Sequence, residues 1–274
     1  GVERAESDRF VFRTPPSELG EWSFVVFGDT RSRHNDHRRV IEAIMRAQPR
    51  PWLAIHTGDL VSDGRKKEDW DIFFRIERAL LGTIPYYPCL GNHERESIYY
   101  YRTFPVPRGG GPHGKAWYSF RFANAAFIVL DSEISLEPQK QFLEKELKQA
   151  ASDGVPWRFV VFHRPAFSSG GHGGATDLQE AWVPIIEKYR VAMVFCGHDH
   201  LYERSVHNGV MYITAGGGGA PLYKPGAKPN PYSVKAEAVH HYVHIIISGR
   251  RATVRAVRAD DTLIEQFTMQ APGN

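Results

Sequence analysis

Five apolar segments of this sequence each end in a side chain that could bind a metal ion or move a proton. These side chains are two carboxylates, an amide and several imidazoles: Asp29, Asp59, Asn92 with His93, His163, and His198 with His200. In four of the segments a glycine comes directly before the polar group, where it lets the backbone turn sharply and leaves room for a close neighbour. Mixed Asp, Asn and His ligands suit metals of the Mn, Fe, Co and Zn group better than calcium or structural zinc.

Each of these signals is weak when taken alone. A Gly-Asp pair after a strand is more often a turn than a ligand, and a single histidine at a strand end is more often a satisfied polar group. The same strand-then-ligand context is nevertheless repeated five times in one chain. Because open α/β sheets bind their ligands outside the carboxyl ends of the strands, we expect the five ends to meet in one site.

The elements that must position these residues follow from hydrophobic periodicity. Apolar runs that end at the polar groups predict strands at 22–27, 52–57, 84–90, 158–162 and 191–196. Helical spacing predicts helices at 37–47, at 67–81, from Pro138 to about 151, and at 176–189. Two further runs, 116–122 and 125–130, predict a hairpin. Strands that alternate with helices indicate an α/β core.

The last third of the chain is rich in strand patterns, at about 202–207, 210–215, 241–248, 251–258 and 262–269. This segment predicts a second sheet that packs on the first. Residues 1–21 are polar, with Pro15-Pro16, and predict an irregular lead-in. No break in composition divides residues 22–274, so we expect them to form a single domain.

Composition excludes several classes of protein. No apolar run among the 274 residues approaches the length of about 20 that a membrane span needs. The net charge is only +3 and the basic residues are scattered, which argues against a dedicated nucleic-acid-binding module. With Cys89 and Cys196 alone, a disulfide framework is excluded although a single bridge is not; buried, inert thiols are the simpler expectation.

Several residues near the motifs are interpreted as structural. His37 is expected at the start of a surface helix, and Tyr202, Glu203 and Arg204 are expected to pack around the last ligands. A dense group of histidines, His240, His241 and His244, lies in the strand-rich region without a matching partner motif. We therefore do not expect that group to bind a metal.

The ordered motifs resemble the calcineurin-like metallophosphoesterase superfamily. They are Gly28-Asp29, Gly58-Asp59, Gly91-Asn92-His93-Glu94, His163 and Gly197-His198-Asp199-His200. The run Gly-His-Asp-His-Leu-Tyr-Glu-Arg over 197–204 and the segment 160–171 are similar to the purple acid phosphatase branch. The resemblance spans roughly residues 22 to 215 and implies an α/β fold, a four-layer α/β/β/α sandwich, with two metal ions at the strand ends.

The resemblance also implies roles for individual residues. One metal ion, Mn, Fe or Zn, would be held by Asp59, Asn92, His163 and His198, and the other by Asp29, Asp59 and His200, with Asp59 as the bridge. Such a pair activates a hydroxide for in-line attack at phosphorus. His93 is expected to face the substrate, where it stabilises the phosphoryl oxygens or protonates the leaving group. His172, in a glycine-rich loop, matches another substrate-facing histidine.

Two positions depart from the family pattern. Arg31 stands where many members have a histidine ligand, and Ser62 stands where purple acid phosphatases have a tyrosine. Arginine stays protonated and cannot bind a metal, so the first metal loses an expected ligand. Three interpretations follow: water or Asn35 completes that site, the metal binds weakly, or Arg31 binds the substrate phosphate through its guanidinium group. We favour two metals with Arg31 beside the phosphate.

The leading hypothesis is a metal-dependent phosphoester hydrolase, and specifically a phosphomonoesterase acting on a small molecule. A phosphodiesterase acting on nucleotides or lipid headgroups is the closest alternative, because both share the metal motifs and differ in cleft shape. A non-catalytic protein that binds phosphate or metal is the second alternative, raised by Arg31 and Ser62. The branch resembled favours an exported or periplasmic protein whose signal has been removed, and the oligomeric state is left open.

Overall fold

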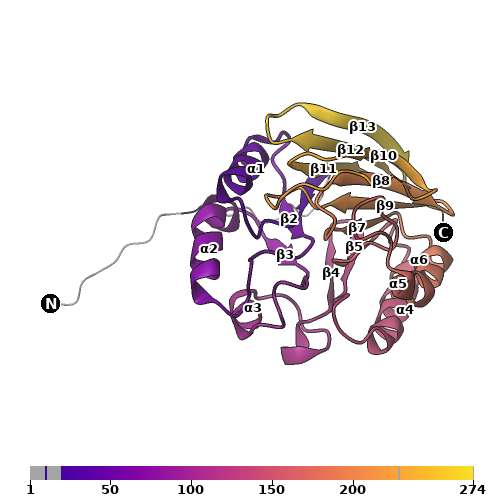
Figure 1. Ribbon diagram of the computed structural model, residues 1–274. Coiled ribbons are helices and arrows are strands. Elements are labelled where there is room, and N and C mark those ends of the chain that lie inside the picture. The colour runs from indigo at the N-terminus through magenta and orange to yellow at the C-terminus, as the bar shows by residue number, and fades with distance from the viewer. Residues whose placement is uncertain (1–9, 11–19, 228, 274) are drawn as a thin grey trace.

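Two β-sheets stacked face to face form the centre of the molecule, and helices cover their outer faces (Figure 1). The computed structural model describes residue 10, residues 20–227 and residues 229–273. On one outer face lie α1 (His34–Arg46) and α2 (Lys67–Leu81); on the other lie α4 (Glu137–Ser152), α5 (Thr176–Ala181) and α6 (Val183–Lys188). The expected four-layer α/β/β/α sandwich is therefore confirmed.

The first sheet has six strands in the order β13-β12-β11-β1-β2-β3. Their bounds are β1 (Glu21–Phe27), β2 (Leu53–His56), β3 (Tyr86–Pro88), β11 (His241–Ser248), β12 (Arg251–Arg258) and β13 (Leu263–Gln270). Strands β1, β2 and β3 run parallel, while β11 pairs antiparallel with β1. The carboxyl ends of the three parallel strands therefore lie at one edge of the sheet.

The second sheet has seven strands in the order β10-β8-β9-β7-β6-β5-β4. Their bounds are β4 (Tyr118–Phe122), β5 (Ala125–Val129), β6 (Trp157–Val161), β7 (Met193–Cys196), β8 (Tyr202–His207), β9 (Val210–Ala215) and β10 (Ser233–Glu237). Here β5, β6 and β7 run parallel. The carboxyl ends of β6 and β7 therefore lie at the same edge of this sheet.

Aromatic side chains from both sheets fill the space between them. Phe24 of β1 packs against Phe127 of β5 and Phe159 of β6, in each case with ring centroids 5.2 Å apart. All three rings are fully buried, and each such burial contributes about 1.5–3 kcal/mol. This interior fixes the two sheets against each other, and with them the loops that carry the polar residues.

The structure corrects several expectations about elements. The helix expected over 176–189 is divided at Trp182 into α5 and α6, because Pro184 lacks an N–H group and is placed in the first turn of a new helix. Strand β3 is shorter than the expected 84–90 and ends at Pro88. Two elements were not predicted from local patterns: β10, and the short helix α3 (Ile98–Thr103), in which Tyr100 and Tyr101 are buried.

The strand-rich last third does not form a sheet of its own. Strands β8, β9 and β10 extend the sheet of β7, whereas β11, β12 and β13 join β1. The alternating pattern predicts a strand but carries no information about its partner, and β11 finds that partner more than 200 residues away in β1, where Val25 lies opposite His244.

His37 is also not where it was expected. It lies on the inner face of α1, is only 1% exposed, and its Nε2 is 2.9 Å from Oε1 of the buried Glu77 on α2. Both cysteines are free and buried, as expected. Of the lead-in expected over 1–21, residues 1–9 and 11–19 lie outside the described residues, and Glu21 already belongs to β1. Among the described residues no helix is long and apolar enough to cross a membrane.

Candidate metal centre

The loops that follow β1, β2, β3, β6 and β7 bring the six predicted ligands to one place. The ligand atoms of Asp29, Asp59 and His163 all lie within 4.8 Å of one another, and all three residues are buried. Around this trio lie the other three residues, Asn92, His198 and His200. In the structure, the residues that follow these five strands lie together, as expected from the sequence.

His163 is the common neighbour in one half of the cluster. Its Nε2 is 3.2 Å from Oδ1 of Asn92, 3.2 Å from Nδ1 of His198 and 3.4 Å from Oδ1 of Asp59. Four separate side chains therefore bring possible ligand atoms close together in this half. The set has the composition that a transition metal ion accepts.

Asp29 is the centre of the other half. Its carboxylate accepts the backbone N–H of His198, at 3.1 Å and 3.0 Å from its two oxygens, and its Oδ1 is 3.5 Å from Nε2 of His200. Asp29 is fully buried. Only two of the expected ligands besides Asp59 therefore belong to this half.

Backbone carbonyls fix which nitrogen His163 and His200 present to the cluster. Nδ1 of His163 is 2.8 Å from the carbonyl of Thr57, and Nδ1 of His200 is 2.6 Å from the carbonyl of Pro221. A carbonyl can only accept a hydrogen bond, so each Nδ1 carries the proton and each neutral ring keeps a lone pair on Nε2. A hydrogen bond from one ring nitrogen to a carbonyl is how metal-binding histidines are typically oriented, and in both residues the other nitrogen, Nε2, faces a carboxylate.

The loops hold these side chains through unusual backbone conformations. Asp29, Asp59 and His198 have φ values of 60°, 57° and 68°, in the left-handed region that costs a non-glycine residue energy. Gly58 has φ of 93°, and a Cβ there would lie 2.7 Å from Nδ1 of His163. Only glycine fits at that position, because the strand must turn directly under the His163 ring.

Glu94 hydrogen-bonds the backbone of two loops that carry predicted ligands, a role that was not predicted from the sequence. Its fully buried carboxylate accepts hydrogen bonds from four backbone N–H groups, those of Asp59, Leu60, Val61 and Gly91, at 2.7–3.3 Å. The same side chain thus ties the loop after β2 to the loop after β3. Burial, assisted by the charge of Asp59, raises the pKa of Glu94 to about 8. The sequence signal that could have indicated this role is the position of Glu94 directly after Asn92-His93 in the third motif.

The charges in the cluster are those of a site that favours a cation. Burial raises the pKa of Asp29, and the charge of nearby Asp59 adds to that effect, while His200 and His163 oppose it. Burial lowers the pKa of His163, but the charges of Asp59 and Asp29 outweigh burial and raise it to about 9. Two buried carboxylates this close repel each other unless positive charge lies between them. The donor set therefore fits metal ions.

Arg31 supplies part of that positive charge. Its Nε lies 3.4 Å from Oδ2 of Asp59, and the hydroxyl of Ser62 donates a hydrogen bond to its backbone carbonyl. The two departures from the family pattern are thus in contact with each other. Asn35, considered as a substitute ligand, is exposed and accepts a hydrogen bond from Arg38 instead.

The two histidines expected to face the substrate lie at the rim of the cluster. His93 is 25% exposed; its Nδ1 is 2.6 Å from the carbonyl of Ser62, and its Nε2 is 3.9 Å from Oδ2 of Asp59. His172 is 47% exposed, and its ring lies 4.2 Å from that of His198. Nδ1 of His172 is 2.9 Å from Oδ1 of Asp199, a fully buried carboxylate whose role the sequence analysis missed.

Other residues near the motifs are structural, as expected. Tyr202 and Arg204 both hydrogen-bond to Glu265 of β13, at 2.7–2.8 Å. Glu203 accepts hydrogen bonds from the backbone and hydroxyl of Ser169. These contacts join β8 to the opposite sheet and to the loop that carries His172.

Known proteins with related sequences and structures place this chain in a family. A family model for the calcineurin-like phosphoesterase matches residues 23–202, which include all six predicted ligands. Probable purple acid phosphatase 20 of Arabidopsis thaliana is 30% identical over 243 residues, covering 78% of this chain and 55% of that protein. The chain spans about half the length of the curated relatives it matches.

Solved structures support the same fold. Purple acid phosphatase PPD1 from yellow lupin has a TM-score of 0.82 at 20% identity, covering 96% of this chain and 56% of that one. GAP50, described as the anchor in the inner membrane complex of Plasmodium, has a TM-score of 0.75 at 17% identity, covering 93% of this chain and 90% of that one. With a family model that matches most of the chain, this protein belongs to the calcineurin-like phosphoesterase family.

Proposed function

We propose that this chain is a metal-dependent phosphomonoesterase that acts on small phosphoesters. The observation that carries the proposal is the buried trio Asp29, Asp59 and His163, whose ligand atoms lie within 4.8 Å of one another. One metal ion would be held by Asp59, Asn92, His163 and His198, and a second by Asp29, Asp59 and His200. When bound, such a pair polarises phosphoryl oxygens and lowers the pKa of water.

The chain's own side chains bind and orient the ester. The carbonyl of Ser62 holds the proton on Nδ1 of His93, which leaves Nε2 at the rim to meet a phosphoryl oxygen or the leaving group. Asp199 orients His172 in the same way, through a contact of 2.9 Å between its Oδ1 and Nδ1 of the ring. The guanidinium group of Arg31 adds a fixed positive charge next to Asp59, where a phosphate oxygen can be bound.

The test is hydrolysis of p-nitrophenyl phosphate by metal-stripped protein during titration with Mn, Fe, Co, Ni or Zn, with bound metal counted in parallel. We expect activity to saturate near two ions per chain. His200→Asn should lower the metal count by about one, while His207→Asn, which alters a histidine paired with Glu187, should leave it unchanged. Saturation at one ion would locate catalysis in the His163 half. No hydrolysis with any metal would overturn the proposal.

A phosphodiesterase would have the same metal motifs, so the choice of substrate distinguishes this alternative from a phosphomonoesterase. Faster cleavage of bis(p-nitrophenyl) phosphate than of the monoester would favour it.

The contact between Arg31 and Asp59 supports a different second candidate, a non-catalytic protein that binds phosphate or metal. The same fold is present in a protein described as an anchor, and fold alone does not determine activity. Calorimetry with inorganic phosphate distinguishes the two, because binding without turnover of any ester would favour this candidate.

We also propose that the protein is exported, because the purple acid phosphatase branch that its motifs resemble is often exported. Fractionation of the native cells tests this, and recovery of the protein only with cytoplasmic markers would contradict it.

A further inference from the structure

The segment of residues 216–226, which follows β9, is joined to the loops of the candidate metal centre by several backbone hydrogen bonds. Its backbone N–H groups donate to the carbonyls of four residues in those loops: Gly218 to Gly28 at 2.8 Å, Ala220 to Asp29 at 2.8 Å, Tyr223 to His200 at 3.0 Å, and Gly226 to Ser169 at 2.7 Å. A Cβ on Gly218 would lie 2.2 Å from the carbonyl oxygen of Gly28, so the glycine run permits this close approach. The segment is therefore a fixed wall of the centre.

Tyr223 is the side chain that this wall presents to the centre. Its ring stacks on the ring of His200, with centroids 4.2 Å apart and an interplanar angle of 22°, and lies 5.5 Å from the ring of His172. The side chain is partly exposed. Burial raises the pKa of the phenol, and the charge of nearby Arg31 opposes that rise. Tyr223 thus lies among a predicted ligand and two groups at the rim.

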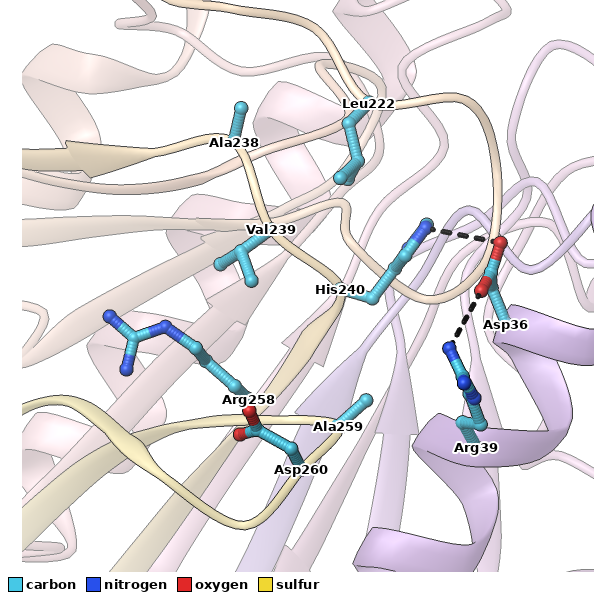
Figure 2. Close-up of a pocket in the computed structure, with 9 residues that line it drawn as sticks. All are labelled: Asp36, Arg39, Leu222, Ala238, Val239, His240, Arg258, Ala259 and Asp260. Atoms are coloured by element: carbon cyan, nitrogen blue, oxygen red, sulfur yellow. Dashed lines mark ion pairs between the residues drawn. The ribbon is translucent and has the colours of Figure 1, made fainter.

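The preceding residue, Leu222, lines a different cavity. Leu222 points into a cavity of about 570 Å³ that is lined with Ala238, Val239 and His240 and that contains none of the six predicted ligands (Figure 2). Leu222 and Tyr223 therefore belong to the same segment but to different surroundings. This makes Leu222 a matched control for any effect of Tyr223.

We propose that Tyr223 is a specificity-determining residue whose partly exposed ring contacts the organic group of the phosphoester and favours flat, apolar groups such as aryl groups. The inference rests on the proposed function, because it assumes that a phosphate is bound beside Arg31 and His172. A phosphate held there directs its ester group toward the rim. The ring of Tyr223 lies beside His172 and His200 and offers an apolar surface there, and an aromatic ring attracts a second flat ring.

The experiment measures binding of two phosphonates, which cannot be hydrolysed, to zinc-loaded protein by calorimetry. We expect the wild type to bind phenylphosphonate about fivefold tighter than methylphosphonate. Tyr223→Ala should reduce that preference to less than about twofold, whereas Tyr223→Phe, which keeps the ring, and Leu222→Ala should retain it. Thermal melting of each variant checks that it is folded, and Tyr223→Leu replaces the alanine variant if that one is not.

Kinetics separate this inference from the proposed function. In steady-state kinetics, Tyr223→Ala should raise KM for phenyl phosphate about fivefold more than it raises KM for glycerol 2-phosphate. A phenyl preference that depends on Tyr223 in a protein without turnover would sustain the inference while the proposed function fails. Equal binding of the two phosphonates by the wild type, or a preference that Tyr223→Ala retains, would overturn the inference.

Discussion

Histidines gather in two regions of this fold, at the candidate metal centre and on β11, and the two regions differ in the charges around them. At the centre, the charges of Asp59 and Asp29 overcome burial and raise the pKa of His163 to about 9. On β11, burial lowers the pKa of His241 and of His244 to about 4. The comparison shows that buried carboxylates, rather than a high density of histidine, distinguish a site for cations.

Hydrogen bonding differs between the two regions as well. His163 and His200 each donate from Nδ1 to a carbonyl and keep Nε2 directed at a carboxylate. Nε2 of His241 and of His244 is buried and has no hydrogen-bond partner among the residues that the structure describes. Within the centre, His198 differs from His163, because burial and the charge of His163 lower its pKa to about 2. Within the cluster the two carboxylates therefore raise the pKa of one imidazole, while burial and that positive neighbour lower the pKa of the next.

The largest expected effect comes from removing the carboxylate that both halves of the centre share. Asp59→Asn should abolish binding of the second metal ion and lower kcat/KM for p-nitrophenyl phosphate on the order of 1000-fold. Metal counting and steady-state kinetics measure both. Asp71→Asn is the control, since Asp71 is 51% exposed and pairs with Lys67. A variant at position 59 that retains two ions and its activity would contradict the assignment.

Glu94→Gln tests whether the centre depends on the support beneath it. An amide cannot accept all the hydrogen bonds that this carboxylate receives, and buried N–H groups would lose their partners. We expect a loss of about 3 kcal/mol in the free energy of unfolding, measured by urea denaturation at about pH 9, above the pKa of about 8 of Glu94. Glu96→Gln, at an exposed neighbouring position, should change it by less than about 0.5 kcal/mol. Equal effects of the two substitutions on the free energy of unfolding would show that the hydrogen bonds of Glu94 do not stabilise the two loops.

The β11 histidines should make the protein sensitive to acid. The unfolded state takes up a proton on His244 below its ordinary pKa of 6.5, while the folded state does so only near 4. The contribution of neutral His244 is therefore fully present above pH 6.5 and is lost as the pH falls toward 4. Between pH 7.5 and 5 we expect this residue to account for about 2 kcal/mol of lost stability.

Urea denaturation of metal-free His244→Leu at the two pH values measures this contribution, because the substitution should reduce the loss by that amount. His34→Leu, at an exposed position, should not. If both variants lose as much stability as the wild type, then the contrast between the two histidine regions is wrong.

Arg31→Ala should have the smallest effect. Loss of one charged contact to a phosphate oxygen should weaken inhibition by inorganic phosphate about tenfold, with the metal count unchanged. Arg38→Ala, which removes an arginine that hydrogen-bonds Asn35, is the control. If Arg31→Ala instead raises affinity for the second metal ion and leaves phosphate inhibition unchanged, Arg31 acts as a competitor of that metal and not as a ligand of the substrate.

Much of the fold could be predicted from local patterns. The periodicity of residues 67–81 coincides with α2, which buries one face at the helical repeat. The run at 22–27 coincides with nearly all of β1, whose apolar residues are all buried because the strand is covered on both faces. Predictions were wrong where a distant partner decides. The residues around His37 are those of a polar helix start. In the structure, however, α2 covers this side chain, and its Nε2 lies 2.9 Å from Oε1 of Glu77. The partner of β11 was likewise outside any local pattern.

By itself, the sequence determined the polar strand ends, their order and the family to which the chain belongs, since these depend on residue type and spacing. Tertiary structure alone decided what each group contacts. It joined Glu94 to four backbone N–H groups, Arg31 to Asp59 and Tyr223 to His200. The physical reason is that burial and charge act over a few ångströms in space, whatever the separation along the chain.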